Sequence, residues 1–151
     1  MACKGSFTGG KPRRFRAKLK AMYQRITRGI KIIVRPQYLE RQSKPDEGHF
    51  VWAYTITVEN HSRETVTLRT RYWKITDAAG KVQEVRGEGV VGEQPTLQPG
   101  ASFQYTSGCP LKTSSGFMVG AYHMETATGE MFSVDIPAFS LDSPHAKQSI
   151  N

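Results

Sequence analysis

Three glycines carry a spacing with a recognised chemistry. Gly87, Gly89 and Gly92 satisfy G-x-G-x-x-G. In dinucleotide-binding folds this spacing lets backbone N–H groups approach a pyrophosphate at the start of a helix. Here Pro95 and Pro99 follow within the first two turns of any such helix, and proline removes backbone donors and disrupts helices. The motif therefore lacks the helix dipole on which that phosphate site depends.

The same glycines allow two other interpretations. In the first, they supply tight turns with positive φ between short strands. In the second, they form a phosphate nest, which is a concavity of successive N–H groups that needs no helix. Arg86 beside the loop favours the nest and Glu88 inside the loop opposes it. Arg69 and Arg71 are nearby basic residues that would also neutralise a phosphate. The sequence leaves both interpretations open.

Catalytic chemistry is not indicated elsewhere in the chain. Ser107 does not stand in G-x-S-x-G, and no histidine or acid can be paired with it from the sequence. The histidines show neither the i, i+4 spacing of a helical metal site nor a neighbouring cysteine pair; they are His49, His61, His123 and His145. We therefore predict that the protein is not an enzyme and binds neither a cofactor nor a metal ion.

Basic residues are concentrated at the N-terminus. The 151 residues carry a formal net charge of +8. Seven basic residues and no acidic ones lie in residues 1–21, so the rest of the chain is close to neutral, at about +1. Nucleic-acid binding, if it occurs, is predicted to depend on this extension. The sequence contains no run of eighteen apolar residues, so no membrane span is predicted.

The N-terminal segment has several interpretations. Phe15, Leu19, Met22 and Ile26 are spaced as one stripe of an amphipathic helix that Gly29 would end. Such a helix suits an anionic membrane surface, a nucleic acid or an organelle-targeting peptide. Residues 1–21 are alternatively a disordered basic extension. A further alternative is that translation starts at Met22, so that the extension is an artefact.

Alternation of apolar and polar residues begins after this segment and predicts strands. It is unbroken from Phe50 to Val58, which indicates a central strand. The phase reverses between Leu68 and Trp73, so a β-bulge is expected near Thr70. Trp52 and Trp73 are in phase with other large apolar residues and are predicted to lie in the core.

Turn signals and prolines divide these strands. Hairpin turns are predicted at residues 77–80 and 126–129, each with its glycine in the left-handed conformation. Pro36 is expected to end a strand or confine it to a sheet edge, and Pro137 to interrupt another. Cys109 precedes Pro110 in a predicted loop, while Cys3 lies in the N-terminal extension, so both are predicted to be reduced thiols of a cytosolic protein.

The strand pattern defines the expected fold. Seven to eight short strands with regular turn signals predict an all-β antiparallel sandwich of the fibronectin type III or immunoglobulin-like kind. The sandwich is predicted to span residues 22–142, and residues 143–151 are expected to form a polar C-terminal tail.

Four segments of the sequence resemble the ApaG family, also called DUF525. They are RYWKITD at 71–77, EVRGEGVVGEQP at 84–95, QYTSG at 104–108 and DIPAFSL at 135–141. The resemblance covers about residues 22–141, and the N-terminal extension departs from it. It implies a fibronectin type III-like sandwich in a small cytoplasmic bacterial protein. It also implies an association with cobalt and magnesium phenotypes and with the gene neighbourhood of diadenosine tetraphosphate hydrolase.

The resemblance bears on function in two ways. Related domains of eukaryotic F-box receptors and of a DNA-polymerase-interacting protein look like protein-binding modules. The family's glycine motif, which has been regarded as a pyrophosphate site, maps onto Gly87, Gly89 and Gly92. We therefore predict a non-enzymatic module, monomeric or dimeric, that binds an unidentified partner protein by strand addition or apolar contact. The alternative is a domain that binds a phosphate-bearing nucleotide through the Gly87–Gly92 loop, with Arg86 and either Arg69 or Arg71 neutralising the phosphate.

Overall fold

A computed structural model of the chain describes residues 22–146. This part contains nine strands, one or two more than the sequence predicts. They are β1 (Tyr23–Thr27), β2 (Ile30–Tyr38), β3 (Phe50–Asn60), β4 (Val66–Asp77), β5 (Val82–Glu88), β6 (Thr96–Leu97), β7 (Ser102–Leu111), β8 (Gly116–Thr126) and β9 (Met131–Leu141). A single 3-10 turn, η1 (Pro45–Glu47), lies in the β2–β3 connection.

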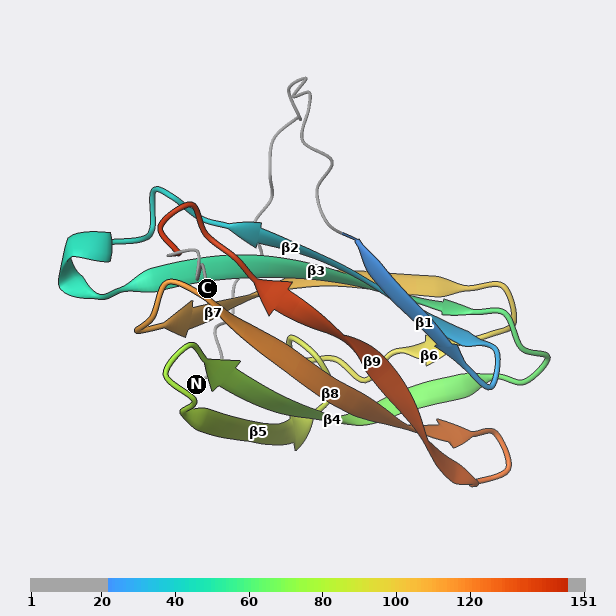
Figure 1. The fold of residues 1–151 in the computed structure, drawn as a ribbon. Helices are drawn as coiled ribbons and strands as arrows, with labels where there is room; N and C mark the ends of the chain where they lie inside the picture. The colour runs from blue at the N-terminus through green and yellow to red at the C-terminus, as the bar shows by residue number, and fades with distance from the viewer. Residues whose placement is uncertain (1–21, 147–151) are drawn as a thin grey trace, which may run out of the picture.

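The strands form two antiparallel sheets that pack face to face (Figure 1). One sheet has the order β1-β2-β3-β7, and the other has the order β5-β4-β8-β9 with the short β6 paired to β4. Every pairing is antiparallel. The predicted all-β sandwich of the fibronectin type III kind is therefore confirmed.

The core between the sheets follows the sequence alternation. Every second residue of β3 from Phe50 to Val58 is buried, and β3 lies between β2 and β7 as predicted for a central strand. Trp52 and Trp73 are only 1% and 3% exposed. Edge-on ring contacts join Trp73 to Tyr54 at 5.4 Å and to Phe139 at 5.9 Å between ring centroids. Both tryptophans are therefore core residues, as predicted.

A β-bulge in β4 decides which residues face the interior. Leu68 pairs with Met124 and Thr70 pairs with His123, so Arg69 is the additional residue that shifts the register. The bulge near Thr70 is confirmed. Because it resets the alternation, the side chain of Arg71 lies on the same, inward face as the buried Trp73.

Prolines are accommodated within strands. Pro137 does not interrupt β9, contrary to the prediction, because two residues of β9 there face one residue of β8 in a second register shift. Pro36 lies inside β2, beyond Val34, where the pairing with β1 ends, so that part of β2 is a local edge as one alternative predicted. The predicted hairpin glycines Gly80 and Gly129 have φ of 87° and 94°.

Two further predictions are wrong. The helix expected to end at Gly29 is absent over its described part: Tyr23–Thr27 is strand β1, and Met22 and Ile26 are 50% and 60% exposed. Pairing with β2 across a tight turn at Gly29 satisfies the backbone there instead. Cys109 is not in a loop but is buried in β7, and Pro110 is tolerated there because β7 is an edge strand.

The rest of the predicted N-terminal helix, the basic extension of residues 1–21 and Cys3 lie outside the described residues. So do the last five residues of the polar C-terminal tail. Within residues 22–146, no helix is long and apolar enough to cross a membrane.

Candidate functional site

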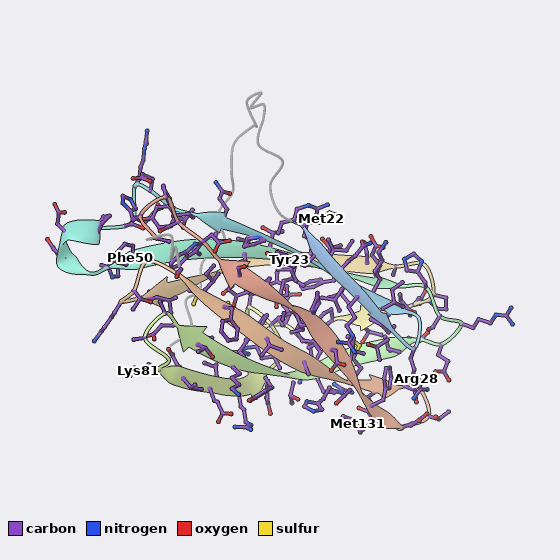
Figure 2. The ribbon with its side chains drawn as sticks, in the orientation of Figure 1. Met22, Tyr23, Arg28, Phe50, Lys81 and Met131 are labelled. Atoms are coloured by element: carbon purple, nitrogen blue, oxygen red, sulfur yellow. The ribbon has the colours of Figure 1, made fainter. Side chains whose placement is uncertain are left out.

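The two long sides of the sandwich differ. On one side β1 lies against β9, and polar contacts join them (Figure 1). Arg25 forms an ion pair with Asp135 at 3.1 Å, and the Ser140 amide donates to the Tyr23 hydroxyl at 3.4 Å. At the end of this side Arg28 reaches the β8–β9 hairpin that carries Met131 (Figure 2), and it pairs there with Glu130 at 3.0 Å. This side is closed.

The opposite side is open. On this side β5 and β7 are the outermost strands of their sheets, and between them lies a cavity of about 300 Å³, which we call the edge cavity. Its lining comprises Tyr54, Arg71, Trp73, Ile75, Gln83, Val85, Glu88, Val90, Val91, Gly92, Tyr105, Ser107, Gly108, Cys109, Pro110 and Met118. The volume is at the lower end of small-ligand sites, and an apolar lining with a few converging polar groups is typical of them.

Arg71 is the charged group inside the edge cavity. Its Nη1 donates to the Glu88 and Gly89 carbonyl oxygens at 3.1 and 2.8 Å. No carboxylate of the described residues lies within ion-pair distance of this guanidinium, whereas Arg25 and Arg28 each have a carboxylate partner. A cation in a partly enclosed apolar site without a counter-charge favours an anionic ligand.

Tyr105, which lines the edge cavity, is paired with a second buried tyrosine, Tyr122. The hydroxyls of Tyr105 and Tyr122 hydrogen-bond to each other across the two sheets. Burial away from water raises the pKa of both phenols well above the ordinary value, and the nearby Tyr54 raises it further. Arg71 opposes this shift, so its charge is felt at both hydroxyls. The pair is therefore neutral at physiological pH.

Alkaline pH is expected to destabilise the fold through this pair. Tyrosines of the unfolded chain ionise near the ordinary pKa of 10.0, whereas Tyr105 and Tyr122 stay protonated in the folded state. Their contribution is complete below about pH 10 and is lost above it, by about 1.4 kcal/mol per pH unit for each tyrosine. Urea unfolding from about pH 9 to pH 11 measures this slope. The free energy of unfolding of the Tyr105→Phe/Tyr122→Phe double variant should depend less on pH over this range. An equal slope for the double variant and the wild type would contradict the assignment.

The three motif glycines have three different roles. Gly87 has no positive φ, but a Cβ there would lie 2.9 Å from both Nη atoms of Arg71, so its bare backbone makes room for the guanidinium. Gly89 has φ of 64°, and its Cβ would lie 2.3 Å from the Glu93 carbonyl oxygen. Gly92 has φ of 81° in open space. Two of the three thus supply positive φ, and the first supports the edge cavity.

Several amides of the glycine loop are bonded within the protein. Gly89 donates to the Arg69 carbonyl at 2.8 Å, and Val90 and Glu93 donate to each other's carbonyls at 2.8 and 2.9 Å. Carbonyls of the same loop face Arg71. A phosphate would therefore have to be held by other groups than these three amides.

The predicted basic residues are not brought together. Arg86 lies on the outer face of β5, where its guanidinium sits 4.7 Å from the Tyr72 ring centre and 4.0 Å from Glu84. Arg69 on the bulge pairs with Glu125 at 2.7 Å. Of the predicted site residues, Arg71, Glu88 and Gly92 line the edge cavity. The other two adjoin the Arg71 guanidinium: Gly87 leaves room for it, and the Gly89 carbonyl accepts a hydrogen bond from it.

The site also includes residues that the sequence analysis did not identify. Val91, at the mouth of the edge cavity, is 46% exposed and has φ of 40°, which is strained for a β-branched side chain. The sequence alternation indicates that Tyr105 and Tyr122 are buried, since each is in the buried phase of its strand. It does not indicate that the two side chains meet across the sheets.

The described residues supply no group of three histidine, cysteine, aspartate or glutamate side chains placed to hold a metal ion. Ser107 is buried in β7 and lines the edge cavity, and no histidine is among the lining residues. The arrangement is suited to holding a small apolar group with one negative charge.

Fold and site together define a fibronectin type III-like sandwich domain with a cavity between two sheet edges. The ApaG domain (DUF525) family profile matches residues 40–126, and the chain belongs to the ApaG family. Protein ApaG of Rhodospirillum centenum and that of Parvibaculum lavamentivorans are 63% and 65% identical to it over 130 residues, covering 86% of this chain and 100% of each relative.

Solved structures support the same assignment. The crystal structure of the putative ApaA protein from Bordetella pertussis is 44% identical, with a TM-score of 0.75 over 78% of this chain and 95% of that one. A second structure is 42% identical, with a TM-score of 0.72 over 82% of this chain and 96% of that one. The family resemblance predicted from the sequence is confirmed.

Proposed function

We propose that the protein is a non-enzymatic binding module that captures an extended segment of a partner protein along the open side of its sandwich. The observation that carries this proposal is the edge cavity between β5 and β7. An extended segment adds to a sheet edge by backbone hydrogen bonds, and a pocket for a side chain supplies specificity. A cytoplasmic location, which the resemblance and the separated cysteines favour, belongs to the same proposal.

The strand edges support this binding mode. Among the described residues, β5 pairs only with β4 and β7 pairs only with β3, so each has an outer edge without a strand partner. The exposed Pro110 on β7 lacks an N–H group, and proline on an edge limits indiscriminate pairing. Because Pro110 also lines the edge cavity, the outer edge of β5 is the better one for backbone pairing beside the cavity.

Val91 adds a second support. A β-branched residue with positive φ costs free energy of folding, and such strain is concentrated at functional sites. Its side chain is exposed at the mouth of the edge cavity, where a bound segment would cover it.

Nucleotide binding through the glycine loop stays a prediction. Three loop amides are occupied by backbone carbonyls, and Arg86 lies on the outer face of the sheet, so these observations favour the first function. The association with cobalt, magnesium and diadenosine tetraphosphate also stays an expectation from the family resemblance.

A peptide selection tests the proposed function. Random heptapeptides are presented to the full chain in two libraries, one with the peptide at a free C-terminus and one with it inside a polar linker. We expect enriched peptides from at least one library, and amide shifts of the isotope-labelled protein should then follow β5, β7 and the Gly89–Glu93 turn. Failure to enrich any peptide, or shifts confined to β1 and β9, would overturn the proposal.

A matched pair of variants sharpens this test. Val91→Asn introduces a residue that tolerates positive φ and removes the apolar contact, so binding of a selected peptide should weaken roughly five-fold, as expected for about 1 kcal/mol of apolar burial. Ile26→Asn changes a more exposed apolar residue on the closed side, 60% against 46% for Val91, and should leave the affinity unchanged. Equal effects of the two variants would place the contact elsewhere.

A further inference from the structure

We propose that the edge cavity is a carboxylate site in which Arg71 binds the free C-terminus of the partner segment, with the terminal apolar side chain in the adjoining cavity. This inference rests on the proposed function and specifies its ligand: the partner presents a chain terminus and not an internal loop.

The guanidinium has the required donors free. Both hydrogen bonds that Arg71 makes to the described residues leave from Nη1, to the Glu88 and Gly89 carbonyls. Nε and Nη2 make none within this part of the chain, and these two nitrogens form the side of the guanidinium that binds a carboxylate through two parallel hydrogen bonds. Gly87 lets the guanidinium lie against β5, which fixes its plane.

The charged residues of the lining favour a ligand with a single negative charge. Arg71 is the one cation among the residues that line the edge cavity. The one acidic residue of the lining, Glu88, has the same strand phase as the outward Arg86 and contacts Arg71 through its backbone carbonyl. A polyphosphate would bring several negative charges against one arginine. A carboxylate matches Arg71 in both charge and shape.

The apolar lining around Arg71 favours a C-terminal carboxylate over the side-chain carboxylate of an internal residue. Trp73, Ile75, Val85 and Met118 form an apolar wall beside the guanidinium. A C-terminal residue bears its carboxylate and its side chain on the same Cα, so one residue fills both the charged and the apolar parts of the cavity. An internal glutamate brings a carboxylate with only two methylene groups and leaves the apolar wall in contact with water.

A path for the rest of the segment adjoins the edge cavity. A second groove, of about 560 Å³, shares Ile75, Gln83 and Pro110 with it and continues between β5 and β7. Lys81 borders this groove at the β4–β5 turn (Figure 2), and Lys112 borders it at the end of β7. Residues that precede the terminus would therefore lie along the sheet edges. Lys81 and Lys112 outnumber the one carboxylate of this groove, Asp77, so acidic residues of the segment would be favoured there.

The test uses small mimics of a chain terminus on the full-length protein. N-acetylphenylalanine and N-acetylleucine are titrated against their C-terminal amides, with inorganic phosphate and N-acetylglutamate α-amide, which keeps its side-chain carboxylate, as further probes, to about 10 mM each and followed by amide NMR shifts. We expect saturable shifts at residues 87–90 and at Tyr105 with the acids, and at least about ten-fold weaker binding of the amides, since one charge-assisted pair is lost.

Two variants locate the effect. Arg71→Met should abolish the preference for the acid over the amide. Because Arg71 also holds two carbonyls, this variant is first compared with the wild type by thermal unfolding and amide spectrum. Glu88→Gln leaves the Arg71 contact with the Glu88 backbone in place and removes the negative charge nearest to the edge cavity in the sequence of β5, so it should strengthen acid binding about two- to three-fold at low salt.

Several results would overturn the inference. Equal binding of acid and amide would do so in the wild type, without any variant. So would phosphate or the glutamate α-amide binding as tightly as the acids, weaker acid binding by Glu88→Gln, or no shifts with any probe. If peptides selected from the internal library still bound along β5 and β7 in that case, the proposed function would stand and only the terminus-specific inference would fail.

Discussion

Replacing Trp73 with alanine is expected to lower the free energy of unfolding by about 3–5 kcal/mol, the range for truncating a large buried aromatic side chain. Trp73 is 3% exposed and makes edge-on contacts with Tyr54 and Phe139, which come from different sheets. The change removes the part of the core that joins the two layers next to the edge cavity. Urea unfolding at constant pH measures the loss.

The adjacent residue provides the matched control. Tyr72 lies on the outer face of the same strand, where it hydrogen-bonds to Glu84 and stacks with Arg86. Tyr72→Ala should therefore cost about 1 kcal/mol or less. Similar losses for Trp73→Ala and Tyr72→Ala would contradict the assigned orientation of β4, and with it the inward position of Arg71.

Replacing Gly89 with alanine is expected to destabilise the protein by about 2–4 kcal/mol. A left-handed backbone costs an alanine about 1–2 kcal/mol. In addition, its Cβ would lie 2.3 Å from the Glu93 carbonyl oxygen, so the turn must open and lose the hydrogen bonds between Val90 and Glu93. The same opening moves the Gly89 carbonyl away from Arg71, so carboxylate binding should weaken as well.

A substitution at Gly92 distinguishes the cost of backbone strain from the cost of the close Cβ contact at Gly89. It also has positive φ, but a Cβ there would meet nothing within 4 Å. Gly92→Ala should therefore cost only the conformational part, about 1 kcal/mol. Denaturant unfolding of both variants gives the comparison, and equal losses would show that the Glu93 carbonyl moves away from an added Cβ at little cost.

The most informative local rule was the alternation of apolar residues. It predicted β3 as a central strand, Trp52 and Trp73 as core residues and the bulge in β4 from the phase reversal between Leu68 and Trp73. These features are predictable because burial of one sheet face imposes a period of two on any sequence that forms it.

Local rules failed where distant partners decide the conformation. The apolar spacing in residues 22–26 fits a helix, yet these residues include most of β1, whose hydrogen bonds are made with β2. Cys109 before Pro110 has a turn-like sequence but lies in an edge strand, where a missing N–H group costs nothing. In both cases the pairing partner outweighs local propensity.

The sequence by itself determined the family, the all-β class and the residues that form the core, because each follows from residue types and their spacing. Only the tertiary structure decided the site. It brings Arg71, Tyr105 and Tyr122 together from three strands of two sheets and sends Arg86 to the outer face. The physical reason is that the edge cavity arises from leaving β5 and β7 unjoined, and spacing along one chain does not encode which edges meet.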